Sequence, residues 1–312
     1  MLSLSKHEDQ RFEPCPHFGT CGGCLLQDLP PADYAAAKRA AVQKALMKAG
    51  VSVEVLAPII VPPRSRRRAV FKIKSLPEGL HIGFHAAKTH TVTDMHHCDV
   101  LTPGLFALVG ALRQRLEPLF GVGEAAELHV TETDTGFDCA FRWRAGLTPA
   151  LTAELTAALS GLGIARLTMG RDLVFEQAAP SVTLGGVTVD LPPNPFLQST
   201  REGEAALQEH VLKIVGRAKT VVDLFKLPLT PAELVPYDAV VLDPPRAGAE
   251  AQVRALAKSR VPVIAYVSCD AASFARDAAI LVKGGYRPGP VTPIDQFLWS
   301  SHIELVAGFR RP

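Results

Sequence analysis

The sequence predicts an α/β protein, with a doubly wound parallel sheet in its C-terminal part and an α+β part before it. Three observations lead to this prediction. From residue 201 to residue 283, helical and strand patterns alternate, and two further strand patterns close the chain. The strands of this region, such as residues 261–268, are short apolar runs, as buried parallel strands are. Residues 51–189 show many strand patterns and few helices, which is typical of an α+β arrangement.

The individual elements follow from local signals. Residues 31–49 are expected to form a helix because prolines stand at its start, alanine fills its turns and Gly50 follows it. Strand patterns run from residue 51 to about 93, with turns at Pro62-Pro63 and near Pro77. The other expected helices are 101–120, 149–162, 201–215, 249–258 and 272–283, and the other strands lie in 128–143, 165–189, 220–225, 237–242, 261–268, 291–297 and 302–310. The composition changes near residues 191–195, so we expect three parts, 1–50, 51–190 and 191–312.

Composition indicates an ordinary globular protein. The 312 residues are 47% hydrophobic and 21% charged, enough chain for about two domains. No run reaches the ~18 apolar residues of a spanning helix, and the polar N-terminus lacks an apolar signal core. We therefore expect no membrane association and a cytoplasmic location.

Local charge is more informative than the net charge of +2. Between Arg64 and Lys74, six residues are positive and none is acidic. This segment is interpreted either as a solvated strand edge or as a ribbon that contacts the phosphates of a nucleic acid.

A cysteine cluster near the N-terminus predicts a metal centre. Cys15, Cys21 and Cys24 have the spacing C-x5-C-x2-C, with two glycines that let the backbone wrap closely around a bound group. Cys98 is the natural fourth ligand, and four thiolates suit structural zinc or an iron–sulfur cluster. The absence of paired C-x2-C knuckles favours [4Fe–4S]. His17, His96 and His97 are alternative ligands, and ordinary buried cysteines are the remaining interpretation.

The C-terminal part carries a candidate catalytic edge. Cys269 follows the buried strand 261–268, and Asp243, in Asp-Pro-Pro-Arg, follows the neighbouring one. Ligands bind at the carboxyl edge of such sheets, and a following helix N-terminus lowers the pKa of a thiol. A structural cysteine is the alternative. Glu304, at the start of the last strand, is by itself more typical of a surface residue.

Together these pieces resemble the S-adenosylmethionine-dependent RNA 5-methyluridine methyltransferases, especially the iron–sulfur branch that acts on 23S ribosomal RNA. The matching pieces, in the family's order, are C-x5-C-G-G-C with Cys98, Gly83-Phe84 before His-His-Cys, Asn194-Pro-Phe-Leu-Gln198, Asp223-Leu-Phe225, Asp243-Pro-Pro-Arg246, Ser268-Cys269-Asp270 and His302-Ile-Glu304. The ordered set is specific, although no single piece is decisive.

The resemblance implies a class I, Rossmann-like methyltransferase domain behind an iron–sulfur, RNA-binding part. It implies that Cys269 is the nucleophile and Glu304 the general base. Gln198, Phe225 and Asp243 match positions that contact S-adenosylmethionine or the bound base, and Cys15, Cys21, Cys24 and Cys98 match the ligands of a [4Fe–4S] cluster. The implied substrate is RNA, with 23S rRNA favoured and tRNA possible, and no protein partner is evident.

The chain departs from the family pattern after Phe225. In the family, a glycine-rich turn, a helix and a strand bearing an acidic ribose partner follow; here only residues 226–236 precede the next strand. A parallel return needs about a dozen residues or more, so we expect an internal deletion on the order of 60 residues. We also expect the family's N-terminal β-barrel to be absent, since only fourteen residues precede Cys15, and Asp270 stands where the family usually has Asn. Weak or no S-adenosylmethionine binding is expected.

Two other functions remain open from the sequence. One is a non-catalytic iron–sulfur RNA-binding protein, in which the N-terminal half does what remains. The other is a zinc-ribbon protein.

Overall fold

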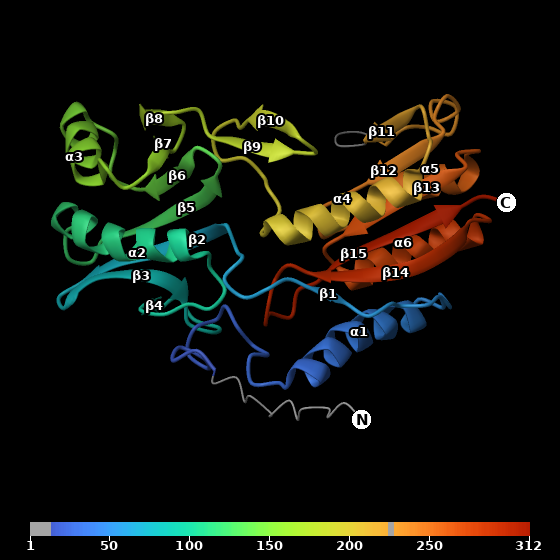
Figure 1. The fold of residues 1–312 in the computed structure, drawn as a ribbon, viewed down its shortest axis with the longest axis horizontal. Helices are drawn as coiled ribbons and strands as arrows, with labels where there is room; N and C mark the ends of the chain where they lie inside the picture. Colours follow the sequence, from blue (N-terminus) through green and yellow to red (C-terminus); the bar gives the residue numbers. More distant parts are fainter. Residues whose placement is uncertain (1–13, 224–227) are drawn as a thin grey trace, which may run out of the picture.

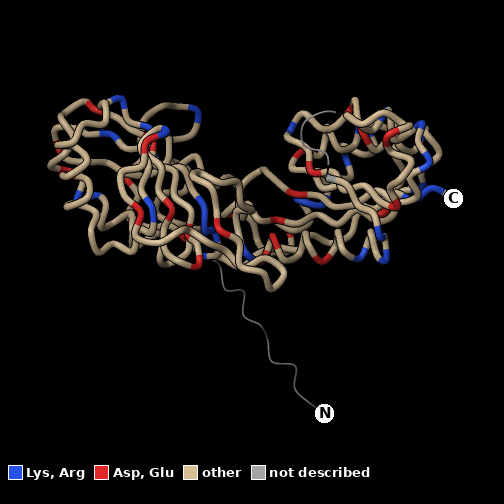
Figure 2. The backbone as a smooth tube through the Cα atoms, turned by 90° about the horizontal axis from the view of Figure 1, so that it is seen from above, with Lys and Arg blue, Asp and Glu red and all other residues tan. Residues whose placement is uncertain are grey.

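The computed structural model describes residues 14–223 and 228–312. Two β-sheets form two lobes (Figure 1), and Figure 2 shows the lobes side by side, joined in the middle of the molecule. A two-stranded antiparallel ribbon, β9 (Ser181–Leu184) and β10 (Val187–Asp190), follows the first sheet in the chain. Within the described residues, no helix is both long and apolar enough to cross a membrane.

The first sheet has seven strands and belongs to the predicted α+β part. Their order is β4 (Val92–Asp94), β3 (Gly79–His85), β2 (Arg68–Leu76), β5 (Ala125–Thr133), β6 (Gly136–Trp143), β7 (Ile164–Met169) and β8 (Asp172–Glu176). Alternate residues of β2, including Phe71 and Ile73, are buried, as a strand with one covered face requires. They form a core with α2 (Pro103–Leu116) and α3 (Pro149–Leu159), and η1 (Glu117–Leu119) continues α2.

The second sheet is the predicted α/β unit. Its order is β1 (Ile59–Ile60), β14 (Arg287–Asp295), β15 (Glu304–Arg310), β13 (Val263–Ser268), β12 (Ala239–Leu242) and β11 (Val221–Asp223). One face packs on α1 (Pro31–Lys48), α5 (Glu250–Lys258) and α6 (Ala271–Lys283), and the other on α4 (Arg201–Val215). Helices on both faces make the sheet doubly wound, as predicted.

β11 lies at the open edge of this sheet and pairs with β12 in parallel. The described part of their connection, residues 228–238, contains turns and no helix. Val221 at this edge is 43% exposed although its neighbours in β12 are buried. Phe225 lies outside the described residues.

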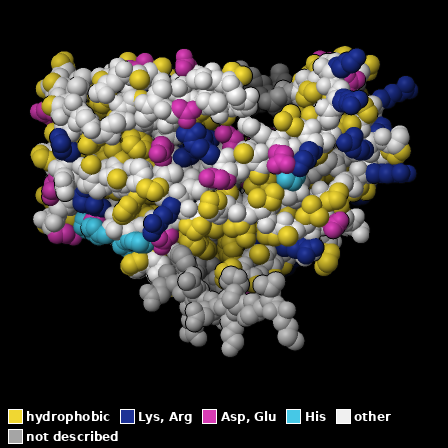
Figure 3. All heavy atoms as spheres, viewed as in Figure 1, with side chains coloured by type: hydrophobic (Ala, Val, Ile, Leu, Met, Phe, Trp, Pro, Cys, Tyr) yellow, Lys and Arg dark blue, Asp and Glu magenta, His cyan; other side chains and the backbone are white. Residues whose placement is uncertain are grey.

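The basic segment Arg64–Lys74 does not form one exposed ribbon. Arg67 is buried and pairs with Glu204 of α4 at 3.1 Å. Lys72 forms an ion pair with Glu127 on the adjacent strand. Both sequence interpretations are therefore wrong for Arg67, because its charge is buried against α4, whereas Lys72 stays partly exposed in its ion pair. On the face in Figure 3, cations and anions are likewise mixed.

α1 packs against the α/β sheet and forms hydrogen bonds with the loop that precedes β15. Lys38, almost fully buried, donates a hydrogen bond to Asp295 at 2.9 Å, and Tyr34 donates another to the same carboxylate. The Tyr34 hydroxyl also accepts from the backbone N–H of Trp299 at 2.7 Å. Lys38 donates further to the carbonyl of His302, two residues before Glu304. A buried charge is tolerated only when it is paired, so this network fixes the position of α1 on the sheet.

Candidate active site and metal centre

Cys269 and Glu304 lie beside each other at one edge of the α/β sheet. β13 and β15 are antiparallel neighbours, and Ser268 stands opposite Leu305, so the next pair along the register is Cys269 and Glu304. Cys269 is half-buried, and Glu304 is only 5% exposed. The interpretation of Glu304 as a surface residue is therefore wrong. The strand register therefore places the Glu304 carboxyl group beside the Cys269 thiol in a partly buried site.

The electrostatics of this pair favour the protonated forms of both groups. Burial raises the pKa of Glu304 to about 7, the Asp243 carboxylate adds to this, and Gln296 and Arg246 oppose it. Burial likewise raises the pKa of the Cys269 thiol, with a further contribution from the charge of Glu304, while Arg246 lowers it. A carboxyl group with a pKa near neutrality can give and take protons at physiological pH. The thiol needs help from a base or a substrate to ionise.

Gln296 is a site residue that the sequence patterns did not single out. It is buried, forms a hydrogen bond with Glu304, and donates another to the side-chain oxygen of Gln198. Its own oxygen accepts from the backbone N–H of Ser199 at 2.9 Å. One amide thus connects Gln198 to Glu304. The only sequence signal for Gln296 was that a polar residue stands at the end of an apolar strand pattern. The same pattern is typical of the start of a turn.

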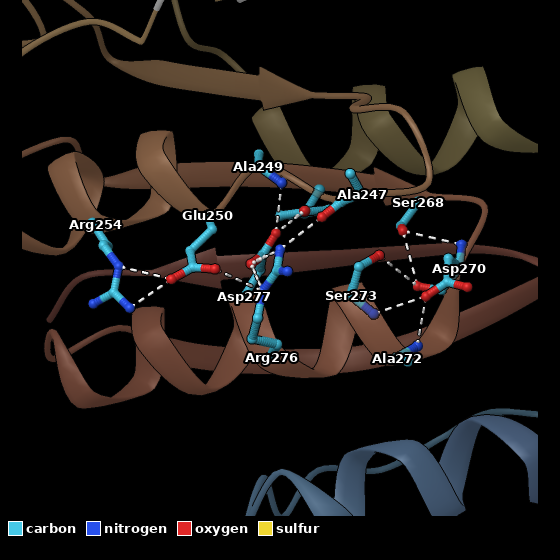
Figure 4. A network of polar contacts seen from close by, with 11 residues as sticks. Ala247, Ala249, Glu250, Arg254, Ser268, Asp270, Ala272, Ser273, Arg276 and Asp277 are labelled. Carbon is cyan, nitrogen blue, oxygen red and sulfur yellow. Dashed lines mark hydrogen bonds and ion pairs between the residues drawn. The ribbon is translucent and has the colours of Figure 1, made fainter.

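The loop that carries Asp243 and Arg246 is anchored at its far end by Asp277 of α6. The Asp277 carboxylate accepts hydrogen bonds from the N–H of Ala249 at 2.7 Å and from the hydroxyl of Tyr266 at 2.6 Å (Figure 4). Gly248 is required here, because its φ is +79° and a Cβ would lie 2.6 Å from Asp277. At the other end, Arg246 contacts the ring of His302 at 3.0 Å. The loop is therefore held over the sheet edge beside Glu304.

The four cysteines of the predicted cluster line one cavity of about 480 Å³. Burial raises the pKa of Cys24 to about 12, and the proximity of the other three thiols adds to this. Gly22 of the loop must be glycine, because a Cβ would lie 2.9 Å from the carbonyl oxygen of His85. Arg246 and His302 line the same cavity, so it reaches the candidate catalytic edge.

The donors of this cavity fit a group that takes several thiolates. Gln27, 2% exposed, has an Nε2 with no hydrogen-bond partner in the described structure, and Arg66 lies close enough for its charge to act on Cys24 and Cys98. Of the alternative histidines, His17 and His97 line the cavity, whereas His96 pairs with Asp94. The donor atoms of Cys15, His97 and Asp99 lie within 4.8 Å of one another. Among the described residues, no three cysteine sulfurs meet that distance.

The fold is shared with a protein of known structure. The structure is similar to the crystal structure of Pyrococcus abyssi tRNA (uracil-54, C5)-methyltransferase in complex with S-adenosyl-L-homocysteine, with a TM-score of 0.70 over 93% of this chain and 84% of that one. At 21% sequence identity, this likeness shows the fold. The predicted fold class is confirmed: the chain has a methyltransferase fold.

Sequence comparison shows the family. No protein-family model matches the chain. An uncharacterized RNA methyltransferase of Rhizobium meliloti (strain 1021) is 36% identical, covering 98% of this chain and 88% of the relative, and one of Brucella suis biovar 1 (strain 1330) is 35% identical over 98% and 86%. The chain therefore belongs to this family of RNA methyltransferases. The 23S rRNA (uracil(1939)-C(5))-methyltransferase of Halomonas elongata is 27% identical over 96% of this chain and 76% of that protein.

Proposed function

We propose that this protein acts on C5 of a uridine in RNA through a covalent bond between Cys269 and C6 of the base. The observation that carries the proposal is the placement of Cys269 and Glu304 as neighbours across two strands. The names of the Halomonas and Pyrococcus relatives, both uracil C5 methyltransferases, support the same base and position. We favour 23S rRNA as the substrate because the relative that matches in sequence acts on it, with tRNA as the alternative.

The residue types match the chemistry that uracil requires. C5 is a poor nucleophile, but addition of the Cys269 thiolate to C6 moves the C5–C6 π electrons into an enolate and makes C5 nucleophilic. C5 then takes a methyl group from a sulfonium donor, or a proton from solvent. Glu304, as the carboxylate, removes the original C5 hydrogen as a proton, and the electrons of that bond expel the Cys269 thiolate. The ring ends as uracil with a new group at C5.

A base must leave its stack to expose C6. Extrusion costs a few kcal/mol and favours loops and single strands. Arg246 and the Gln296–Gln198 pair lie next to Glu304 and are the polar groups available to hold the edge of such a base. The test of this proposal is exchange of the uridine C5 hydrogen with solvent, which requires Cys269 and Glu304 but no methyl donor.

The methyl donor implied by the family is S-adenosylmethionine, and Gln198, Asp243 and Phe225 are the residues we assign to it. We also propose that part of its site has been deleted from this chain. The alignment with the Rhizobium relative is 364 positions long, 52 more than the 312 residues here, so at least that many positions face gaps in this chain. The open edge at β11 and the short connection to β12 support a deletion at that point. Without the glycine-rich turn and the acidic ribose partner, adenosine loses most of its contacts.

S-adenosylmethionine should therefore bind weakly or not at all. Isothermal titration of the purified protein should give no saturable heat at micromolar ligand, and Asp243→Asn should remove any residual signal. Micromolar affinity with one site per chain would contradict the deletion of the cofactor site. If S-adenosylmethionine binds this weakly, the chain would act as an RNA-binding protein that retains the C6 addition chemistry.

We assign the cysteine cavity to a [4Fe–4S] cluster held by Cys15, Cys21, Cys24 and Cys98. Around a single zinc ion, with Zn–S of about 2.3 Å, tetrahedral thiolates lie about 3.8 Å apart. A cluster binds each cysteine through a different iron, so its ligand sulfurs lie farther apart than those around one zinc ion. Among the described residues, no three cysteine sulfurs lie within 4.8 Å of one another, which supports this assignment. The positive charge of Arg66 and the N–H groups of Gln27 complement an anionic cluster.

Anaerobically purified protein should contain about four iron atoms and four sulfide ions per chain. Cys24→Ser should lower the iron content sharply, whereas Cys139→Ser, at a buried cysteine of β6 that does not line the cavity, should leave it unchanged. One zinc ion per chain without sulfide would favour a zinc site instead.

A further inference from the structure

A second cavity, a groove of about 540 Å³, runs between α1 and the start of α6 and ends at Cys269. The chemistry proposed above gives it no role. Its lining consists mainly of small and positively charged residues: Ala41, Lys44, Ala45, Lys48, Ala49, Cys269, Asp270, Ala271, Ala272, Ala275, Arg276, Ser301, His302 and Ile303.

The α1 wall presents two uncommitted cations. Ala41, Lys44, Ala45 and Lys48 follow the spacing i, i+3, i+4 and i+7, so they share one face of the helix. Both lysines are exposed, and neither has a carboxylate partner within the described part of the chain. The alanine side chains on this face are small, so a sugar–phosphate backbone can approach the helix closely. The longer lysine side chains can then contact its phosphates.

The α6 wall contributes one carboxylate, and one of its oxygens is engaged in capping the helix. Asp270 lines the groove, but its carboxylate caps α6 by accepting from the N–H groups of Ala272 at 3.0 Å and Ser273 at 2.8 Å (Figure 4). Arg276 is held by Asp277 and by the carbonyl of Ala247. The groove therefore offers Lys44 and Lys48 to an anionic ligand, and the carboxylate that lines it, that of Asp270, has one oxygen engaged by the N-terminus of α6.

The groove is continuous with the catalytic edge. Ser301 and His302 line both this groove and the cysteine cavity, and Cys269 stands at the groove's end. A uridine that reaches Cys269 remains attached to its strand on both sides, so the strand must leave the site along an open path. An open, positively rimmed path is what a single strand requires.

We infer that the groove between α1 and α6 binds the RNA strand next to the target uridine, with Lys44 and Lys48 contacting its phosphates; this rests on the proposed action on RNA. The strand enters across the region shared by the two cavities and leaves along α1.

The test compares two double variants with equal changes in charge. Lys44→Glu with Lys48→Glu alters the groove, and Lys258→Glu with Lys283→Glu alters exposed lysines at the last turns of α5 and α6, away from Cys269. Affinity for a fluorescein-labelled, uridine-containing single-stranded RNA is measured by anisotropy at several salt concentrations. Lys44→Gln with Lys48→Gln serves as a milder version of the groove variant.

The groove variant should bind RNA about 10- to 100-fold more weakly at low salt, and its salt slope should fall by about 1.4, as expected for two lost contacts to a single strand. The Gln version should show the same loss of slope with a smaller loss of affinity, and the control pair should stay within about threefold. Equal weakening in both Glu variants, or none in the groove variant, would overturn the inference while leaving the action on RNA standing. If the unaltered protein binds no RNA, the proposed function fails as well.

Discussion

Replacing Cys269 by alanine should abolish exchange of the uridine C5 hydrogen, lowering its rate by at least about 10³-fold. Exchange requires C5 to become nucleophilic, which addition of a nucleophile to C6 achieves, and Cys269 is the group assigned to this addition. Among the described residues, Cys269 is the one cysteine that lines this groove, and the cysteines of the neighbouring cavity are assigned to the cluster. The readout is tritium release to water from RNA labelled at uridine C5, without any methyl donor, so an impaired cofactor site cannot mask the result.

The control is Cys139→Ala. This cysteine is 1% exposed, on β6 of the other sheet, so its removal deletes a thiol without touching the candidate site. The control should release tritium at a rate within about twofold of the unaltered protein. Persistent release by the Cys269 variant would show that another group adds to C6, and the assignment of the nucleophile would have to be abandoned.

Replacing Glu304 by glutamine should slow the same exchange by about 10²- to 10⁴-fold while RNA affinity is retained. Glutamine has the shape of glutamate and keeps a hydrogen-bond partner for Gln296, but it cannot accept the C5 proton. Glu209→Gln, at an exposed residue of α4, should leave the rate unchanged. If the Glu304 variant exchanged as fast as the unaltered protein, water or another group would have to be the base.

The pH dependence gives a second readout of Glu304. Its pKa is raised to about 7, and only the carboxylate accepts a proton, so the rate should rise as the pH passes through about 7. The pKa of Cys269 is also raised, so a further rise should follow in the alkaline range as the thiolate forms. In Glu304→Gln the step near 7 should disappear and only the alkaline rise should remain. A step near 7 that survives in this variant would belong to another group.

Where the candidate residues lie at strand ends, the sequence predicted that they come together at one sheet edge. Cys269 and Asp243 follow neighbouring buried strands, and the carboxyl ends of parallel strands share an edge whatever the rest of the chain does. Glu304 joins them because β15 runs antiparallel beside β13. The expected closing hairpin predicted the pairing of β14 with β15 and not this one. The helices could be predicted equally well, because local periodicity and capping residues determine them. The expected helix 201–215, for example, is α4 (Arg201–Val215).

Contacts between distant segments could not be predicted in this way. Arg67 is paired with Glu204, and nothing in a run of basic residues indicates that one of them is buried against a helix far along the chain. Lys38 and Asp295 are similarly remote, so the attachment of α1 to the α/β sheet was not visible from the pattern of α1. Gln296 acquires its place at the site only through the neighbours that the fold brings to it.

The most direct measurement is site-resolved exchange in the unaltered protein. Ribosomal RNA lacking 5-methyluridine would be incubated with it in heavy water, without S-adenosylmethionine, and each uridine would be examined by mass spectrometry. Deuterium should enter C5 at one uridine of 23S rRNA and should be absent when the Cys269 variant is used. RNA that is bound by the protein yet gains no deuterium at any uridine would contradict the pairing of thiol and carboxylate as a catalytic centre.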